Sequence, residues 1–262
     1  MTQLWRSRLA VDAVPVVLGR FELDHVLGRG SHGVVFAAHD RALGRDVALK
    51  VFGSQSAHAA LHEAQVLARV QHPNVVVLHD VGQSGGFHYL VLALIDGGTL
   101  SDCIRTGLDW RTAVELFVQV GRGLAAAHDA CVVHGDVKPG NMLVGRDGHA
   151  YLADFGSAQS IVPGEPTITR GTPEYAAPES SGGGERGPWS DQFSFCVGLW
   201  EALFGERPTD GAKPRAHSDV PAQLRQVLRR GLSTKPRDRY SDVTELLHRL
   251  ADLDCPPPRP TR

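Results

Sequence analysis

The sequence predicts an α+β fold, in which a small antiparallel β-sheet with one helix is followed by a mainly helical region. Short apolar runs separated by glycine-containing turns recur between Phe21 and Leu94, as in the strands of an antiparallel sheet. Beyond Leu94 the apolar residues return every three or four positions, which is the period of a helix. A chain of 262 residues can form one large domain or two lobes.

The first region contains five expected strands and one helix. The helix is predicted over Ser56 to Val70, because apolar side chains recur on one face there. Turn signals at Gly28 to Gly33 and at His72-Pro73-Asn74 separate this helix and the strands from one another. The strands are expected at Phe21 to Leu27, Val34 to Ala38, Asp46 to Val51, Val75 to Val81 and Phe87 to Leu94.

The second region contains four expected helices. Asp109 is a suitable N-cap for a helix that continues to about His128. A strongly apolar helix is predicted over Ser190 to Phe204, and two shorter ones over Gln223 to Leu232 and Asp242 to Leu250. The face of the first helix that is expected in the core consists of Ala113, Leu116, Phe117, Val120, Leu124 and Ala127.

Composition and charge narrow the functional classes. The formal net charge is −2, so no overall basic surface is expected for nucleic acid or an anionic membrane. The scattered cysteines, Cys103, Cys131, Cys196 and Cys255, predict neither a zinc site nor a disulfide framework. The sequence has no signal-peptide pattern and no apolar run of the ~18 residues that a bilayer requires. We therefore expect a cytoplasmic protein without a membrane segment.

The polar stretch from His134 to Asn141 lies between two short apolar runs and contains Asp136. Asp154 follows thirteen residues after Asn141, beyond a hairpin signal, so a second carboxylate can return to the same place. One carboxylate can orient a hydroxyl, while the other can hold a divalent cation together with the side-chain amide of Asn141. These groups provide the positioning and the charge neutralisation that phosphoryl transfer needs.

Two further motifs have both a structural and a functional interpretation. The glycines of Gly28 to Gly33 can let backbone amides approach phosphate oxygens, or they can simply form a hairpin turn. Lys50 lies on an expected strand, and Glu63 lies on the following helix as its candidate ion-pair partner. The alternative is that both are solvated surface residues, and these interpretations stay open at this point.

These motifs together resemble those of the protein kinase family. The resemblance covers about residues 20 to 250 and includes Gly171 to Glu179, which is similar to the end of a kinase activation segment. Lys138, in the loop with Asp136, is typical of the Ser/Thr branch of the family. The compact chain resembles the bacterial eukaryotic-like Ser/Thr kinases, which act in signalling. The family implies a bilobal fold with a five-stranded sheet and one helix in the small lobe. The expected parts are an N-terminal extension at 1–18, a small lobe at 19–95, a large lobe at 96–252 and a Pro-rich tail at 253–262.

The resemblance implies ATP and Mg²⁺ as cofactors, in the cleft of the bilobal fold, and a serine or threonine of a protein as the acceptor. Asp136 would accept a hydrogen bond from the substrate hydroxyl, Lys138 would support the γ-phosphate, and Thr172 would steady both. Asn141 and Asp154 would bind magnesium. The residues that would bind the nucleotide are Gly28, Gly30, Gly33, Val35, Ala48, Lys50, Glu63, Leu92, Ala93, Ile95 and Leu143.

The same resemblance implies two structural contacts and one regulatory property. Asp191 is expected to bond to the catalytic loop, which is the stretch from His134 to Asn141, and Arg239 is expected to pair with Glu179. Gly135 stands where most family members have an arginine, whose charge is neutralised by a phosphothreonine of the activation segment. We therefore expect activity that does not depend on phosphorylation of this segment.

Two other functions share part of the pattern. A small-molecule phosphotransferase of the aminoglycoside kinase type also has the loop sequence His-Gly-Asp, although it has no use for a segment like Gly171 to Glu179. A pseudokinase could bind ATP and act as a scaffold, although the lysine, the asparagine and both aspartates of the motifs are present. His134 is an alternative general base, but the family disfavours it because its ring is packed and the adjacent aspartate does that work.

Overall fold

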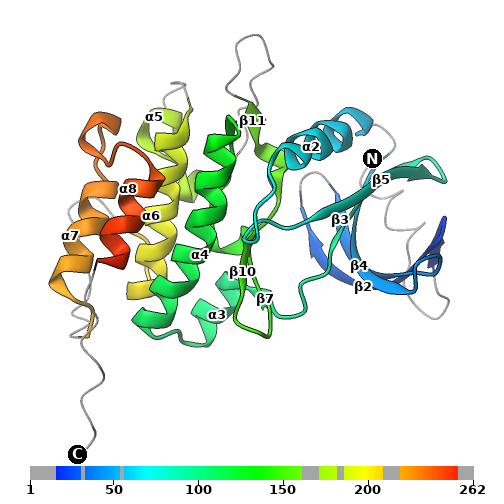
Figure 1. Ribbon diagram of the computed structural model, residues 1–262, viewed down its shortest axis with the longest axis horizontal. Helices are drawn as coiled ribbons and strands as arrows, with labels where there is room; N and C mark the ends of the chain where they lie inside the picture. The colour runs from blue at the N-terminus through cyan, green and yellow to red at the C-terminus, as the bar shows by residue number, and fades with distance from the viewer. Residues whose placement is uncertain are drawn as a thin grey trace, which may run out of the picture. The chain divides into compact units, whose positions relative to one another are not determined.

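A computed structural model of the chain describes residues 16–30, 33–53, 56–160, 171–181, 186–208 and 219–252. The chain divides into two compact units. The first unit consists of Met1–Ala68 and Val76–Ile95, and the second of Arg69–Val75 and Asp96–Arg262. Strands predominate in the first unit and helices in the second (Figure 1). The expected α+β class, with the change from sheet to helix near Leu94, is confirmed.

The first unit contains an antiparallel sheet whose described strands have the order β1-β2-β3-β4-β6-β5. These six described strands are one more than the five expected, because Val16–Leu18 (β1) pairs with β2. Gly19 permits this hairpin, since its φ of +60° suits glycine in a tight turn. The other strands are Phe21–Arg29 (β2), Val34–Asp40 (β3), Arg45–Phe52 (β4), Leu78–Ser84 (β5) and Phe87–Ala93 (β6).

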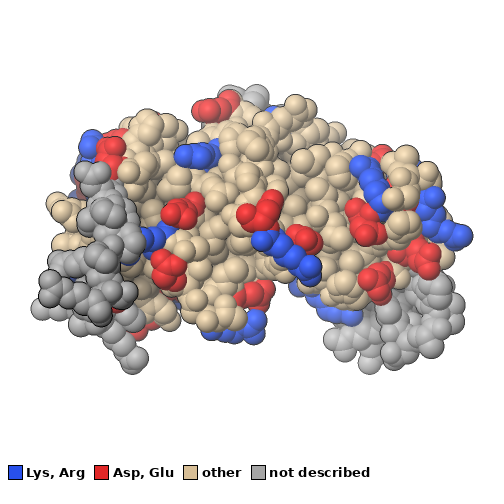
Figure 2. Space-filling view, turned by 60° about the horizontal axis from the view of Figure 1, so that its bottom comes forward, with Lys and Arg blue, Asp and Glu red and all other residues tan. Residues whose placement is uncertain are grey.

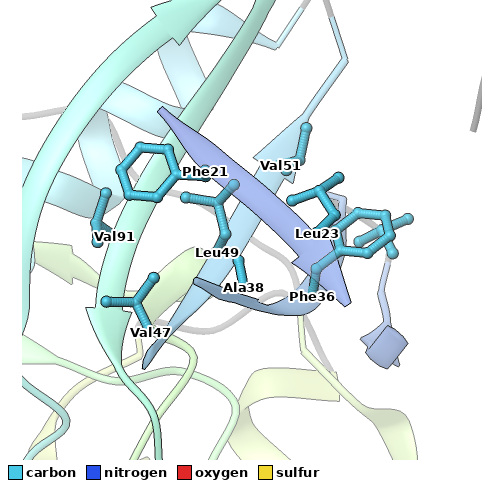
Figure 3. Packing of buried hydrophobic residues seen from close by; sticks show 9 residues of the cluster. Phe21, Leu23, Phe36, Ala38, Val47, Leu49, Val51 and Val91 are labelled. Atoms are coloured by element: carbon cyan, nitrogen blue, oxygen red, sulfur yellow. The ribbon is translucent and has the colours of Figure 1, made fainter. Parts of the chain in front are cut away.

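Alternation along the strands separates an apolar face of the sheet from a second face. In β4, Val47, Leu49 and Val51 belong to the apolar cluster, so Ala48 and Lys50 point to the opposite face. A register slip of one residue would exchange the two faces, and each buried apolar side chain opposes it by about 1.5–3 kcal/mol. The cluster, shown in Figure 3, consists of Phe21, Leu23, Val34, Phe36, Ala38, Val47, Leu49, Val51 and Val91.

The helix α2 (Ala57–Arg69) ends within one residue of each expected boundary. Its buried positions include the apolar Ala60, Ala64 and Leu67, and also the carboxylate of Glu63. A carboxylate is seldom buried without a partner, because loss of its hydration is costly. The burial of Glu63 therefore points to a specific ion pair.

The segment Arg69–Val75 belongs to the second unit although it lies between α2 and β5. Leu152 donates its N–H to the carbonyl of Asn74 at 2.8 Å, and Val75 forms an isolated bridge with the same residue. These backbone contacts explain why β5 begins at Leu78 and not at Val75 as expected.

The second unit contains two long helices, α4 (Trp110–Asp129) and α6 (Pro188–Phe204). Asp109 caps α4 as expected, since its side chain accepts two N–H groups of the first turn. All six residues of the expected core face of α4 are buried. The remaining helices are α3 (Leu100–Thr106), α5 (Pro178–Ser181), α7 (Ala222–Gly231) and α8 (Val243–Ala251).

The helix α3 was not expected, because it is short and only Leu100 among its residues is buried. Its signal in the sequence is the cap. Thr99 accepts the N–H of Asp102, and the Asp102 carboxylate accepts the N–H of Thr99, which is a capping box. Apolar periodicity does not contain this signal, because the capping residues are polar.

Short strands of the second unit fix the ends of its loops. Gly98–Thr99 (β7), Met142–Val144 (β9) and Ala150–Leu152 (β10) form one sheet, and Val132–Val133 (β8) pairs with Gln159–Ser160 (β11). The strands β8 and β9 bracket the polar loop as expected, and β9 and β10 form the expected hairpin.

Surface properties are unremarkable on the face that Figure 2 shows, where Lys and Arg side chains are interspersed with Asp and Glu. Within the described ranges, no helix combines the length and the apolarity that crossing a bilayer requires.

The expected pair of Arg239 and Glu179 is confirmed. Nη1 and Nη2 of Arg239 each donate to one carboxylate oxygen of Glu179 at 2.8 Å. The arginine side chain is fully buried, and it also donates to the carbonyls of Trp189 and Ser233. This bidentate pair ties the end of the Gly171–Glu179 segment to the helical body.

Two glycines of α4 allow close packing, with different neighbours. A Cβ on Gly121 would lie 2.4 Å from a methyl carbon of Leu247, which can rotate away. A Cβ on Gly123 would lie 2.4 Å from the carbonyl oxygen of Asn74, which is backbone and cannot. The contact at Gly123 therefore fixes how closely α4 approaches the Arg69–Val75 segment.

We predict that Gly123→Ala destabilises the chain by about 1–3 kcal/mol through overpacking. Gly121→Ala is the matched control, because it gains the same helix propensity of about 1 kcal/mol on the same helix. Urea unfolding of the two variants measures the difference. Equal stabilities of the two variants would show that the Gly123 contact is not restrictive.

Candidate active site

The loop between β8 and β9 is held by a buried carboxylate in the first turn of α6. Asp191 accepts the N–H of His134 at 2.8 Å and the N–H of Gly135 at 2.9 Å, which confirms the expected contact. Its Oδ2 also lies 2.9 Å from Nε2 of His128 at the end of α4. The Asp191 side chain is 2% exposed, so these hydrogen bonds are little weakened by water. The role of His128 was not expected, because no local pattern links it to Asp191.

Asp136 is the centre of the loop. Its Oδ2 accepts from Nζ of Lys138 at 2.8 Å and from Nδ2 of Asn141 at 3.0 Å. Its Oδ1 accepts the N–H of Thr172 at 2.8 Å, and Nζ of Lys138 also donates to the Thr172 hydroxyl. The structure thus brings together the three residues to which the sequence assigned catalytic roles, with one of the two assigned to the metal.

The ionisation of Asp136 follows from these contacts. Partial burial raises the pKa of this carboxyl, but the hydrogen bonds from Lys138 and Thr172 and the charge of Lys138 outweigh burial and lower the pKa below its ordinary value. Asp136 is therefore an anion at neutral pH. It can accept a hydrogen bond from a hydroxyl, but it is a weak base towards a neutral alcohol.

His134 is fully buried, and both of its ring nitrogens are engaged. Nδ1 accepts the N–H of Asp136 at 3.2 Å, and Nε2 donates to the carbonyl of Ala153 at 3.0 Å. The ring also packs edge-on against Phe155, with centroids 4.8 Å apart. An imidazole with both nitrogens bound to the backbone is not available as a general base.

A backbone contact brings the main chain just before Asp154 next to Asn141. Ala153 donates its N–H to the Asn141 carbonyl at 2.9 Å, and Asp154 follows directly. Asp154 has a left-handed backbone with φ of +60°, which is uncommon outside glycine and frequent at functional sites. Because Nδ2 of Asn141 is bound to Asp136, the carboxamide oxygen is the atom that can bind a cation.

These donors fit a hard divalent cation such as Mg²⁺, which prefers oxygen ligands. The described residues contain no group of three or more His, Cys, Asp and Glu side chains placed to hold a metal. Asn141 and Asp154 would supply two protein oxygens to such a cation.

In the first unit, Lys50 and Glu63 form a buried ion pair. Nζ of Lys50 donates to the two carboxylate oxygens of Glu63 at 2.6 and 2.7 Å. The side chains are 7% and 1% exposed, so neither is a solvated surface residue. Removing one partner of such a pair costs about 3–5 kcal/mol, which makes the pair a firm constraint on α2.

Lys50 shares one face of the sheet with three apolar residues that were expected at a nucleotide site. Val35 is the register partner of Lys50, and Leu92 is the register partner of Ala48. Cross-strand partners lie on the same face, and so do residues two apart on β4. The four side chains therefore lie together, opposite the apolar cluster.

Packing explains the glycine at one position of the turn between β2 and β3, but not at two others. A Cβ on Gly33 would lie 2.2 Å from the carbonyl oxygen of Val51, so packing against β4 requires glycine there. A Cβ on Gly28 or Gly30 would meet no atom within 4 Å, and neither has a left-handed backbone. Packing among the described residues gives no reason for these two glycines. The N–H of Gly30 donates to the carbonyl of Gly33 at 2.9 Å, and Gly28 is the register partner of Val35. Ser31 and His32 lie outside the described residues.

The remaining expected nucleotide residues lie at the ends of strands. Ala93, the last residue of β6, donates its N–H to the carbonyl of Val77 at 2.9 Å. Ile95 ends the first unit. Leu143 lies on β9 in the second unit, where it pairs with Tyr151 of β10.

Comparisons with known proteins agree on one family. The protein kinase domain model matches residues 21–261. Serine/threonine-protein kinase PknA of Mycobacterium tuberculosis is 34% identical over 275 residues, which cover 93% of this chain and 64% of PknA. Pkn2 of Myxococcus xanthus is 34% identical over 94% of this chain and 31% of the relative. For PknB of Mycolicibacterium smegmatis the identity is 30%, over 87% of this chain and 42% of PknB.

This chain therefore spans less than two thirds of the length of each of these relatives. The family match extends over nearly all of the chain and includes every residue of the catalytic cluster. The chain belongs to the protein kinase domain family.

Proposed function

We propose that this chain is a Ser/Thr protein kinase, which transfers the γ-phosphoryl group of ATP to a serine or threonine hydroxyl of a protein. The observation that carries the proposal is the cluster in which Asp136 binds Lys138, Asn141 and Thr172. It holds an anionic hydrogen-bond acceptor next to a cation in a fixed geometry. The names of PknA, Pkn2 and PknB, all serine/threonine-protein kinases, support the same activity.

In the proposed mechanism, Asp136 accepts a hydrogen bond from the substrate hydroxyl and so directs its oxygen towards the γ-phosphorus. As the new P–O bond forms and the bond from the γ-phosphorus to the β,γ-bridging oxygen breaks, the hydroxyl becomes acidic and passes its proton to Asp136. Lys138 stabilises the charge on the γ-phosphoryl oxygens. Thr172 keeps both side chains in place, so little reorganisation accompanies the reaction.

In this proposal the phosphate-binding groups are Lys50, Asn141, Asp154 and the glycine-containing turn. Lys50, oriented by Glu63, binds the α- and β-phosphates. Asn141 and Asp154 hold Mg²⁺, which supplies neutralisation of phosphate charge when it is bound. The backbone amides that would cover the phosphates are those around Gly28, Gly30 and Gly33.

The adenine base would contact apolar side chains and main chain. Val35, Ala48 and Leu92 provide apolar surface on one face of the sheet, and Leu143 provides it in the second unit. The main chain of Ala93 and Ile95 would bond the base. Backbone bonding tolerates the alanine at this position, because the side chain takes no part.

A protein acceptor is favoured over a small molecule by the Gly171–Glu179 segment. Arg239 holds one end of it through Glu179, and the hydroxyl of Tyr175 within it donates to Glu201 at 2.6 Å. A platform anchored in this way fits an extended polypeptide. An aminoglycoside-type enzyme would have no use for it.

We also propose a cytoplasmic location for the activity. ATP is available there, and thiols remain reduced. Cys103, Cys131 and Cys196, the cysteines within the described ranges, are free thiols.

Asp136→Asn is expected to reduce phosphoryl transfer by about 10² or more while leaving ATP affinity nearly unchanged, since Asp136 faces the acceptor hydroxyl. Lys50→Met is expected to abolish transfer as well, because it also removes the ligand of the phosphates. Transfer is measured as phosphate incorporated into a generic protein substrate, and affinity by titration with MgATP.

Three outcomes, from two substrates and one binding measurement, distinguish the possible activities. Phosphate on the protein substrate supports the proposal, phosphate on a member of an aminoglycoside panel indicates a small-molecule phosphotransferase, and ATP binding without transfer indicates a pseudokinase. Undiminished transfer by Asp136→Asn would refute the assigned role.

We further propose that activity does not require phosphate on the activation segment. Gly135 has a φ of +75°, and a Cβ at this position would lie 2.7 Å from the carbonyl oxygen of Ser157. The loop is therefore adapted to glycine, and no cation precedes Asp136 that a phosphate would neutralise. The candidate phosphorylation sites, Thr167 and Thr169, and the neighbouring Arg170 lie outside the described residues.

The double variant Thr167→Ala, Thr169→Ala is expected to retain transfer within a few-fold of the parent, because no switch depends on these hydroxyls. The kcat and KM of both proteins are compared under the same conditions. A drop of about a hundredfold, equivalent to about 2.7 kcal/mol of transition-state stabilisation, would contradict the proposal.

A further inference from the structure

The step from Gly171 to Thr172 completes the catalytic cluster, since Thr172 contacts both Asp136 and Lys138. A shift of this step would remove two hydrogen bonds from the reacting groups at once. The position of Gly171 relative to the catalytic loop is therefore a requirement of the proposed reaction.

Gly171 is exposed, but two groups lie close to the side on which a Cβ would stand. A Cβ at Gly171 would lie 2.7 Å from the carbonyl oxygen of Gly135 and 3.3 Å from Nη1 of Arg186. Gly171 does not have a left-handed backbone, so close approach and not conformation requires glycine. The guanidinium of Arg186 and the carbonyl of the catalytic loop therefore reach the same point beside Gly171.

Arg186 lies just before α6, the helix whose first turn also binds the catalytic loop. It lies two residues before Pro188, the first residue of α6, and Asp191 in the first turn of α6 binds the loop amides. Arg186 and Asp191 thus reach the same region from one end of α6.

Little space remains around these groups. A cavity of about 20 Å³ is lined by Gly135, Gly171, Arg186 and Asp191, among other residues. This volume holds about one water molecule. A cavity of this size does not hold a phosphate group, so the geometry at this cavity favours a role of Arg186 in packing.

We propose that Arg186 is a positioning residue, which holds Gly171 against the carbonyl of Gly135 and so keeps Thr172 on Asp136 and Lys138. The planar guanidinium can lie flat against a residue without a side chain while its N–H groups face a carbonyl oxygen. The consequence for transfer rests on the proposed kinase activity, whereas the contact itself does not.

The test uses the full chain and compares Arg186→Met, Arg186→Lys and Arg186→Ala. Arg229→Met, an exposed arginine on α7, is the control. The first readout is amide hydrogen exchange of the peptide around Thr172, which does not depend on activity. We expect exchange there to be about tenfold faster in Arg186→Met than in the wild type or Arg229→Met, because the amide bound to Asp136 is released more often.

The second readout is kinetic. Arg186→Met is expected to have a kcat at least about tenfold lower, with the KM for ATP within about twofold, since the nucleotide ligands are untouched. Arg186→Lys should recover part of this loss. Guanidinium at millimolar concentration should restore activity to Arg186→Ala and not to Asp136→Asn, an effect that general destabilisation would not produce.

Unchanged exchange at Thr172 in Arg186→Met would overturn the inference, and so would a kcat within twofold of the wild type. If the wild type itself transfers no phosphate, the proposed function fails, and the exchange measurement alone decides on Arg186. Faster exchange in that case supports the positioning contact without the kinase activity.

Discussion

The buried carboxylate of Asp191 is the constraint on which the candidate active site depends. It accepts the N–H groups of His134 and Gly135 at the point where β8 ends and the loop begins. A buried N–H group without an acceptor costs about 1–3 kcal/mol, so the loop follows the path that satisfies both groups. The position of Asp191 in the first turn of α6 is itself favourable, because a helix N-terminus stabilises negative charge. The geometry around Asp136 is built outward from this anchor.

A second constraint acts within the first unit. Burial of the apolar cluster sets the register of β3 and β4, and that register places Lys50 and Ala48 together on the opposite face. Glu63 then needs Lys50, because its carboxylate is buried on α2. Core packing in the first unit thus positions Lys50, and hydrogen bonding in the second unit positions Asp136. Both residues have a role in the proposed phosphoryl transfer.

Apolar periodicity predicted α2, α4 and α6 closely, because burial of one face determines where such helices begin and end. It missed α3, whose signal lies in the cap formed by Thr99 and Asp102. Turn chemistry and family motifs predicted the residues around Asp136. The contact of His128 with Asp191 and the proximity of Arg186 to Gly171 join distant positions through the fold, and no local pattern in the sequence contains them.

The Asp191 carboxylate thus holds the catalytic loop, His134 to Asn141, in the geometry that the proposed reaction requires. The most direct measurement is the kcat for phosphoryl transfer of Asp191→Asn at saturating MgATP. An asparagine can accept one of the two loop N–H groups, but its own N–H groups oppose the other. We predict that the kcat of Asp191→Asn is at least about tenfold lower than that of the wild type, with ATP affinity retained. A kcat within twofold of the wild type would contradict it.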